Sequence, residues 1–533
     1  MSSQATASEG LLDSEERKVA VDLSREEGGE VRFPRGTFRK AVGAMLALVM
    51  AIAATYAVPA LHWARPWTLD MDYVPFWNLI GRELLGEGEQ AEAVDAEVKE
   101  AVALARAEEE KEEAQEAFQD VQVREPVQEG EKVPELAPHE DDAQPVEAPL
   151  ERPEALERFY AALTRTHLGL PGAITRVVHY GDSAIGNDGI TGAIRSKMQA
   201  RFGDAGHGFH LLGQPNASYR HQGVRFDEKS PWAHCFIIFD CKKDGYYGLG
   251  GTTFESTGGA EIRLSTAQKG PAGRKVARFE VWYAGIPKGG TLRLRLDDGE
   301  PVELPTAAEA IEDRWHVIEA EDGEHTLSVR AAGGGKVRAY GVVMERTVPG
   351  VVWDEMSQIG ALTRRMLNFD REHLKRQMAR RDPDLLVLMF GGNDMNTQGT
   401  MEKHRGELTD VLRMFRAEDP ALPCLVMAPL DHGERDGSGK IVTRSIVPKI
   451  VQAQREVAEA EGCAFFDTYE AMGGSGSMGR WVRSSPALGA GDLSHLTHHG
   501  HKVVGAMLVR SLMQGYAAYR RKIAGMPVAG LGE

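Results

Sequence analysis

Hydrophobic and polar positions alternate along the chain in a way that predicts short strands separated by helices. Apolar runs predict buried strands, and stretches with apolar residues three or four positions apart predict amphipathic helices. The predicted strands are residues 174–180, 383–390, 422–429 and 463–466, and the predicted helices are 154–166, 189–202, 371–380, 402–416, 446–461 and 499–513. This order is typical of an α/β fold, in which helices cover both faces of a parallel sheet.

Residues 223–347 have another pattern, with short alternating runs separated by glycine-rich turns. The runs are residues 235–239, 261–265, 277–283, 291–296, 325–329 and 336–344. Such spacing predicts a small antiparallel β-sandwich. Because it interrupts the α/β domain, that domain is predicted to consist of residues 153–222 and 348–520, followed by a tail at 521–533.

An uncharged run from Ala41 to Leu61 is long enough to cross a bilayer about 30 Å thick. Three basic residues lie at positions 35–40, and only Arg65 follows closely. The positive-inside rule therefore predicts a cytoplasmic tail at 1–40 and an N-terminal transmembrane helix at 41–61. The alternative is a cleaved signal peptide, although the polar stretch before the run is long for one.

Residues 62–152 carry most of the charge and are predicted to form an acidic stalk. The whole chain has a formal net charge of -17, and residues 86–150 hold 21 acidic and 5 basic side chains, so the rest is close to neutral. An exposed helix or loose coiled coil is predicted for 87–120, and disorder for 121–153. Since the chain has no basic stripe, nucleic-acid binding is not expected.

Cysteines and histidines form no metal-binding pattern. The cysteines are Cys235, Cys241, Cys424 and Cys463, and the clustered histidines are His207, His210, His498, His499 and His501. No Cys-x-x-Cys pair occurs and the histidine spacing fits no usual zinc site, so no metal or other cofactor is expected. We favour free buried thiols for all four cysteines. The alternative for Cys235 and Cys241 is a disulfide across a hairpin outside the cytoplasm.

Three separate motifs hold the residues that acyl transfer requires. Gly181-Asp182-Ser183 ends one predicted strand, Gly391-Gly392-Asn393-Asp394 ends another, and Asp492-Leu493-Ser494-His495 lies near the end of the chain. Serine, histidine and a carboxylate form a nucleophilic site, and an asparagine amide is a suitable donor to an oxyanion. Each motif alone also fits a capping turn or surface loop, but the three together favour an esterase or acyltransferase that acts on ester-linked acyl groups.

Together the motifs resemble the SGNH (GDSL-type) hydrolase superfamily, which implies a three-layer αβα fold. By this resemblance Ser183 is the nucleophile, His495 the general base and Asp492 its orienting partner. The oxyanion hole would consist of the backbone N–H of Ser183, the side-chain amide of Asn393 and the backbone N–H of Gly360. The residue before that glycine is usually Asn in the family, whereas this chain has Ile.

The jelly-roll-like insertion, with residues 202–209 and 381–384, is similar to the peptidoglycan O-acetylesterases of this superfamily. This similarity implies a bacterial serine esterase, which the membrane helix predicted at 41–61 would hold in the inner membrane, single-pass, with its catalytic domain in the periplasm. It would remove O-acetyl groups from peptidoglycan or another envelope glycan through an acyl-serine intermediate. Two alternatives stay open: an O-acetyltransferase that works with a multi-span membrane partner, and an inactive glycan-binding scaffold. Candidates for stacking on sugars, or else for the sandwich core, are Trp232, Tyr246, Tyr247, Trp282 and Tyr283.

Overall fold

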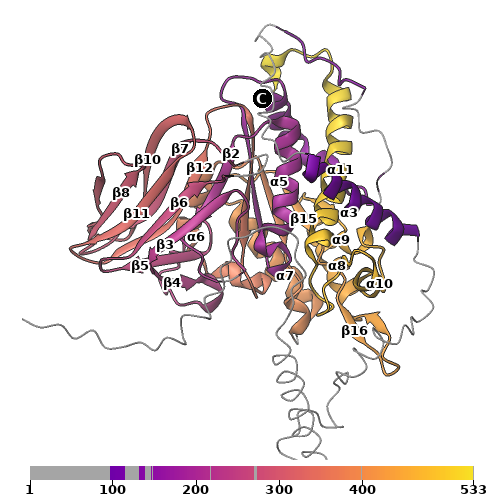
Figure 1. Cartoon of the computed structure of the whole chain (residues 1–533). Helices are drawn as coiled ribbons and strands as arrows, with labels where there is room; N and C mark the ends of the chain where they lie inside the picture. The colour runs from indigo at the N-terminus through magenta and orange to yellow at the C-terminus, as the bar shows by residue number, and fades with distance from the viewer. Residues whose placement is uncertain are drawn as a thin grey trace, which may run out of the picture. The chain divides into compact units, whose positions relative to one another are not determined.

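The computed structural model describes residues 96–114, 131–138, 146, 148–216, 218–268, 273–397 and 399–531 (Figure 1). The predicted cytoplasmic tail, the predicted membrane helix from Ala41 to Leu61 and much of the predicted stalk lie outside these residues. Within the described ranges, no helix combines the length and the apolar character that crossing a membrane requires.

A five-stranded parallel sheet lies at the centre of the α/β region. Its strands, in spatial order, are β13 (Gly350–Ser357), β1 (Ile174–Gly181), β14 (Leu385–Met389), β15 (Cys424–Met427) and β18 (Ala464–Phe466). All four neighbouring pairs are parallel. The strands are buried because helices pack on both faces, as the apolar runs predicted.

Two groups of helices cover this sheet, one on each face. The helices are α4 (Glu157–His167), α5 (Gly189–Phe202), α6 (Arg371–Arg381), α7 (Met401–Phe415), α8 (Val447–Ala460) and α11 (His498–Ile523), with the short α9 (Thr468–Ala471) and α10 (Ser477–Arg483). Apolar residues of α4, α5 and α11 pack with Val177 on one face. Those of α6, α7 and α8 pack with Val178 on the other. Consecutive strand residues point to opposite faces, so the result is a three-layer αβα sandwich.

The sequence pattern missed strand β13 because two acidic residues interrupt its apolar run. Asp354 and Glu355 are both buried. The Asp354 carboxylate accepts a hydrogen bond from Arg381 Nη2 at 2.9 Å, so a paired charge replaces the expected hydrophobic side chain. Burial raises the pKa of Glu355 to about 8, and the charge of Asp188 adds to this effect.

The chain between β1 and β13 adds a β-sandwich of two antiparallel sheets to the α/β region. One sheet contains β10 (Glu312–Gly323), β7 (Val276–Gly285), β12 (Val337–Glu345), β5 (Thr252–Ser256) and β4 (Ala233–Phe236), and the other β3 (Val224–Ser230), β6 (Glu261–Thr266), β11 (Thr326–Gly333), β8 (Thr291–Leu296) and β9 (Val302–Pro305). Strand β2 (Gly206–Leu211) pairs with β12. The sandwich therefore starts before the boundary predicted at residue 223.

Most of the aromatic residues proposed for sugar stacking form the core of the sandwich instead. Trp232, Tyr247, Trp282 and Tyr283 are all buried in the core, so of the two predictions the core alternative is confirmed for them and sugar stacking is not. Tyr246 stacks on His373, with ring centroids 4.4 Å apart, and is not free to bind a sugar through that face.

All four cysteines form disulfides, so the prediction of free thiols is wrong. Cys424 and Cys463 are neighbours because β15 and β18 are adjacent, with Leu425 opposite Ala464. Their Cα atoms are 4.7 Å apart.

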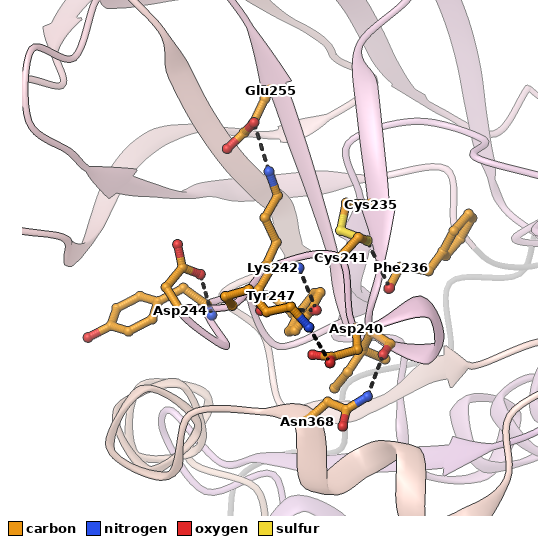
Figure 2. The surroundings of a disulfide bond; sticks show 12 residues. Cys235, Phe236, Asp240, Cys241, Lys242, Asp244, Tyr247, Glu255 and Asn368 are labelled. Atoms are coloured by element: carbon orange, nitrogen blue, oxygen red, sulfur yellow. Dashed lines mark hydrogen bonds and ion pairs between the residues drawn. A yellow bond between two sulfur atoms is a disulfide. The ribbon is translucent and has the colours of Figure 1, made fainter.

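The Cys235–Cys241 bridge is the one that the alternative prediction had named, and it closes a short loop after β4 (Figure 2). Beside it, the Lys242 ammonium lies 2.8 Å from the Glu255 carboxylate. Asn368 Nδ2 also donates to the Ile237 carbonyl oxygen at 2.9 Å. The first contact fixes the loop to β5, and the second fixes it to the segment that follows β13.

The described parts of the predicted stalk pack on the domain. Helix α3 (Ala96–Ala114) lies against α11 (Figure 1), and Val98, Ala101 and Ala105 are buried there. These positions form one apolar stripe with helical spacing, which a solvated helix would not need. Val133 is buried too, and its N–H donates to the Met526 carbonyl at 2.8 Å. The prediction of an exposed, partly disordered spacer is thus wrong for these residues.

Candidate active site

The sheet order places a crevice between the ends of β1 and β14. In chain order the strands lie as 2-1-3-4-5, so the direction of the connections reverses between the first and third strands. Ligands of such folds bind at this point, beyond the carboxyl ends of the strands. Ser183 follows the end of β1 directly, and Asn393 follows the end of β14. Two motifs far apart in the sequence therefore meet at one edge of the sheet.

Ser183, His495 and Asp492 form one chain of hydrogen bonds. Ser183 Oγ lies 2.8 Å from His495 Nε2, and His495 Nδ1 lies 2.7 Å from Asp492 Oδ2. The other carboxylate oxygen of Asp492 accepts the backbone N–H groups of Ser494 and His495, each at 3.0 Å. This is the arrangement of a serine, a general base and an orienting carboxylate.

The same bonds keep the Asp492 carboxylate ionised. Partial burial raises the pKa of this carboxyl, but the hydrogen bond from the His495 ring and those from the two backbone N–H groups outweigh burial. The pKa of Asp492 therefore lies below its usual range. A carboxylate that keeps its charge fixes the imidazole and stabilises the imidazolium that forms during acyl transfer.

Backbone hydrogen bonds hold the loop that carries Asp492 and His495. The Ala490 N–H donates to the His495 carbonyl, and the Gly433 N–H donates to the Leu493 carbonyl, both at 2.8 Å. Leu493 has a φ of 63°, in the left-handed region that leucine rarely adopts. Such strain is typical of functional loops, and it lets the Asp and the His, three residues apart, face each other.

Asp182 connects the nucleophile loop to the loop of Asn393. Its buried carboxylate accepts the Ala184 N–H at 3.0 Å and the Gly392 N–H at 3.2 Å. Burial raises the pKa of Asp182 to about 6, the bond from Ala184 opposes this, and the charge of Asp394 adds to it. The sequence indicated the local capping bond, but the bond to Gly392 depends on the neighbouring strand.

Asn393 offers an amide without a partner to the site. Its Nδ2 atom is buried and has no hydrogen-bond partner within the described residues. It lines a cavity of about 220 Å³ together with Ser183 and His495. A buried N–H group without a partner is costly unless a ligand supplies an acceptor. The developing oxyanion of a substrate would be such an acceptor.

Gly360 lies in an exposed turn after β13, with a φ of 79°. This turn is next to the nucleophile loop, because the Gln358 N–H donates to the Gly181 carbonyl at 2.8 Å. Gly360 is nevertheless absent from the residues that line the cavity. The structure thus brings Ser183, Asn393 and His495 to one cavity, with Asp492 bonded to His495 behind it, and the role of Gly360 stays a prediction.

Two cavity residues, His432 and Arg444, were missed by the sequence analysis. His432 lies in the loop that follows the end of β15, and Arg444 follows β17 (Ile441–Thr443), the partner of β16 (Gly433–Arg435). Burial lowers the pKa of His432 to about 4, and the charges of Arg444 and His495 add to this. The predicted strand 422–429 could have pointed to these residues, because loops at the carboxyl ends of such strands form the site.

A second cavity, of about 470 Å³, is lined in part by the turn that follows Asn393 and by α7. Its lining includes Asp394, Arg364 and His404 but neither Ser183 nor His495. Although it is larger, it lacks the hydroxyl nucleophile, so the smaller cavity is the candidate active site. Across the described ranges, no group of three or more His, Cys, Asp and Glu residues is arranged to hold a metal ion.

Comparison with known proteins agrees with this geometry. A model of the GDSL-like lipase/acylhydrolase family matches residues 330–503. This range contains Asn393, Asp492 and His495, whereas Ser183 precedes it because the β-sandwich separates the first motif from the others. No curated protein matches the chain.

Solved structures add the comparison of folds. A peptidoglycan O-acetylesterase structure is 20% identical, with a TM-score of 0.57, and covers 68% of this chain and 96% of that chain. A family two carbohydrate esterase from Cellvibrio japonicus is 11% identical, with a TM-score of 0.23, over 55% of this chain and 98% of that chain. The second agrees too little to bear on the fold. The chain therefore contains a GDSL-like lipase/acylhydrolase domain and is an SGNH-type serine hydrolase that resembles the peptidoglycan O-acetylesterases in fold.

Proposed function

We propose that this esterase removes O-acetyl groups from peptidoglycan or another envelope glycan. The observation that carries the proposal is the hydrogen-bonded chain from Ser183 through His495 to Asp492, beside the unpartnered amide of Asn393. The likeness in fold to a peptidoglycan O-acetylesterase supports this substrate class. The cavity beside Ser183, of about 220 Å³, has room for an acetyl group.

The reaction would proceed through an acetyl-Ser183 intermediate. Ser183 Oγ attacks the carbonyl carbon of the acetyl ester while its proton moves to His495 Nε2. The tetrahedral oxyanion accepts the Ser183 N–H and the Asn393 amide. It then expels the sugar oxygen, which takes the proton from His495. A water molecule repeats the attack on the acyl-serine with His495 as its base, and acetate leaves.

We also propose that the segment from Ala41 to Leu61 anchors the enzyme in the bacterial inner membrane, with its catalytic domain on the periplasmic side. The uncharged run and the basic residues before it support this orientation. The two disulfides support an oxidising compartment, because such bonds are rare in the cytosol. Accessibility of a C-terminal tag to protease in spheroplasts tests the orientation, and a tag protected until lysis would contradict it.

The test of activity is acetate release from a chromogenic acetyl ester and from O-acetylated peptidoglycan, by the full chain in mild detergent. A fragment from residue 153 onward is unsuitable because it would expose the apolar residues that α3 covers. We expect Ser183-dependent release from both substrates.

Other outcomes separate the alternatives. Release from the small ester alone would contradict the peptidoglycan substrate. It would favour another glycan or transfer to a sugar hydroxyl, which acceptor sugars and product analysis would reveal. The O-acetyltransferase alternative would further require the multi-span partner. No release from either substrate would contradict the esterase and favour the glycan-binding scaffold.

A further inference from the structure

Arg444 is a charged residue in the candidate active site that the reaction does not use. It lines the same cavity as Ser183, Asn393 and His495. An arginine is always charged and presents five N–H donors in a planar fork. A cation beside the reacting groups needs a counterion, polar neighbours or a ligand to stabilise its charge.

The partners of Arg444 within the described residues are neutral. Its Nη1 donates to Asn396 Oδ1 at 3.1 Å, and its Nη2 donates to the Met395 carbonyl at 3.3 Å. None of the ion pairs within the described ranges involves Arg444. Two arginines of α7 differ, because Arg405 pairs with Glu456 and Arg413 pairs with Glu461.

The position of Arg444 is fixed. Its backbone N–H donates to the His432 carbonyl at 2.9 Å, and its carbonyl accepts the Val447 N–H at 3.0 Å, just at the start of α8. These backbone bonds fix the main chain of Arg444, and its two side-chain bonds hold the guanidinium against the turn that follows Asn393. The guanidinium is therefore pre-positioned, which lowers the entropy that binding costs.

Other charges near the cavity do not neutralise Arg444. The Asp492 carboxylate is engaged by His495, and the Asp182 carboxylate by the N–H groups of Ala184 and Gly392. His432 stays neutral at pH 7, since its pKa is about 4, and the charge of Arg444 contributes to that shift. The positive charge of Arg444 thus raises the electrostatic potential inside the cavity. No ion-paired carboxylate among the described residues balances it.

We propose that Arg444 binds a carboxylate on the acetylated sugar, so that the substrate is an acidic glycan whose carboxylate is free. This proposal rests on the proposed esterase function and narrows its substrate. A guanidinium and a carboxylate form a charge-assisted, bidentate pair. Such a pair would orient the sugar so that its acetyl ester lies at Ser183. Arg444 is therefore a substrate-binding residue that selects by charge.

The experiment uses two pairs of acetyl esters, each differing only in charge. One pair is 6-O-acetyl-N-acetylmuramic acid and its methyl ester, and the other is an O-acetylated methyl glucuronoside and its methyl ester. We expect the full chain to prefer the acid in at least one pair by about 10- to 100-fold in kcat/KM, as a charge-assisted bond of 1.5–3 kcal/mol implies. The pair that shows the preference identifies the source of the carboxylate.

Arg444→Gln should bring the ratio of kcat/KM for the acid to kcat/KM for its methyl ester close to one, whatever its effect on the neutral esters, and Arg444→Lys should restore part of this ratio. The matched control is Arg435→Gln, which removes the same charge from the exposed hairpin next to the site. Among the described residues, the Arg435 side chain bonds only to the Gly439 carbonyl, and Arg435 does not line the cavity.

Three results would overturn the inference: no preference in either pair, a preference that survives Arg444→Gln, or an equal loss by Arg435→Gln. If the wild type hydrolyses none of the four esters and no chromogenic ester, the proposed function itself fails. Serine-dependent hydrolysis without charge selection contradicts only the role of Arg444.

Discussion

Ser183 and Asn393 extend from the ends of two neighbouring buried strands, whereas Asp492 and His495 lie in a loop whose side chains are about half exposed. The exposed fractions are 54% for Asp492 and 45% for His495. The nucleophile half is fixed by the central sheet and by the Asp182 carboxylate. The base half is fixed mainly by hydrogen bonds within a few residues, together with one backbone bond from Gly433 to Leu493. We therefore expect substitutions in the nucleophile half to affect activity or stability, depending on the residue. Substitutions in the base half should affect activity alone.

The largest effect is expected for Ser183→Ala. Loss of the nucleophile should lower kcat by at least about 10⁴-fold, as in other serine hydrolases. The melting temperature should change little, because Ser183 Oγ has its bond to His495 in a partly exposed site. Steady-state hydrolysis of a chromogenic acetyl ester measures the loss. Ser438→Ala, in the exposed hairpin, is the control, and retained turnover by Ser183→Ala would show that the nucleophile is another residue.

Asp492→Asn tests the exposed half. The amide cannot stabilise the imidazolium, so we expect kcat to fall by about 10³-fold, somewhat less than the ~10⁴-fold loss known for a buried triad aspartate. Thermal unfolding should not change, because the loop is exposed. Asp436→Asn provides the matched control on a nearby hairpin. A loss of less than about tenfold in kcat would mean that water can replace the Asp492 carboxylate beside His495. The catalytic role of that carboxylate would then be small.

Asp182→Asn tests the connection between the strands through the pH dependence of stability. The folded-state pKa of about 6 lies above the usual value of 3.8, so the native state holds this proton more tightly than the unfolded chain. The contribution of Asp182 to the free energy of unfolding is present below pH 4, is lost as the pH rises to about 6, and changes by roughly 3 kcal/mol.

The difference in unfolding free energy between the wild type and Asp182→Asn should therefore vary between pH 4 and 6 and be constant above. Urea unfolding at a series of pH values measures it. Parallel curves for the two proteins would contradict the shifted pKa of this carboxyl.

Asn393→Ala should have the smallest effect of the four. Removal of one oxyanion donor typically costs about 10²-fold in kcat. The unfolding midpoint should not fall, because the Nδ2 atom has no partner to lose within the described protein. Separate measurement of kcat and KM distinguishes loss of oxyanion stabilisation from loss of substrate binding. A rise in KM with unchanged kcat would mean that the amide binds the ground state and not the oxyanion.

Much of the fold could be predicted because its signals are local. The helix predicted at 189–202 has the same bounds in the structure, and the strands at 174–180 and 291–296 agree within one residue. Periodicity over ten residues depends only on which face is buried. β13 was missed because Asp354 and Glu355 are buried and polar, and β2 because its partner β12 lies more than a hundred residues later.

The sequence by itself determined the motifs, their order and the pairing of Asp492 with His495, since these residues are three positions apart in one loop. Only the tertiary structure decided what lies beside Ser183. The Ser183–His495 bond spans 312 residues and the Asp182–Gly392 bond spans 210. The Cys424–Cys463 bridge and the position of Arg444 in the cavity likewise depend on strands that meet only in the sheet. Hydrophobic periodicity records which face of each element is buried, whereas such contacts depend on which elements become neighbours.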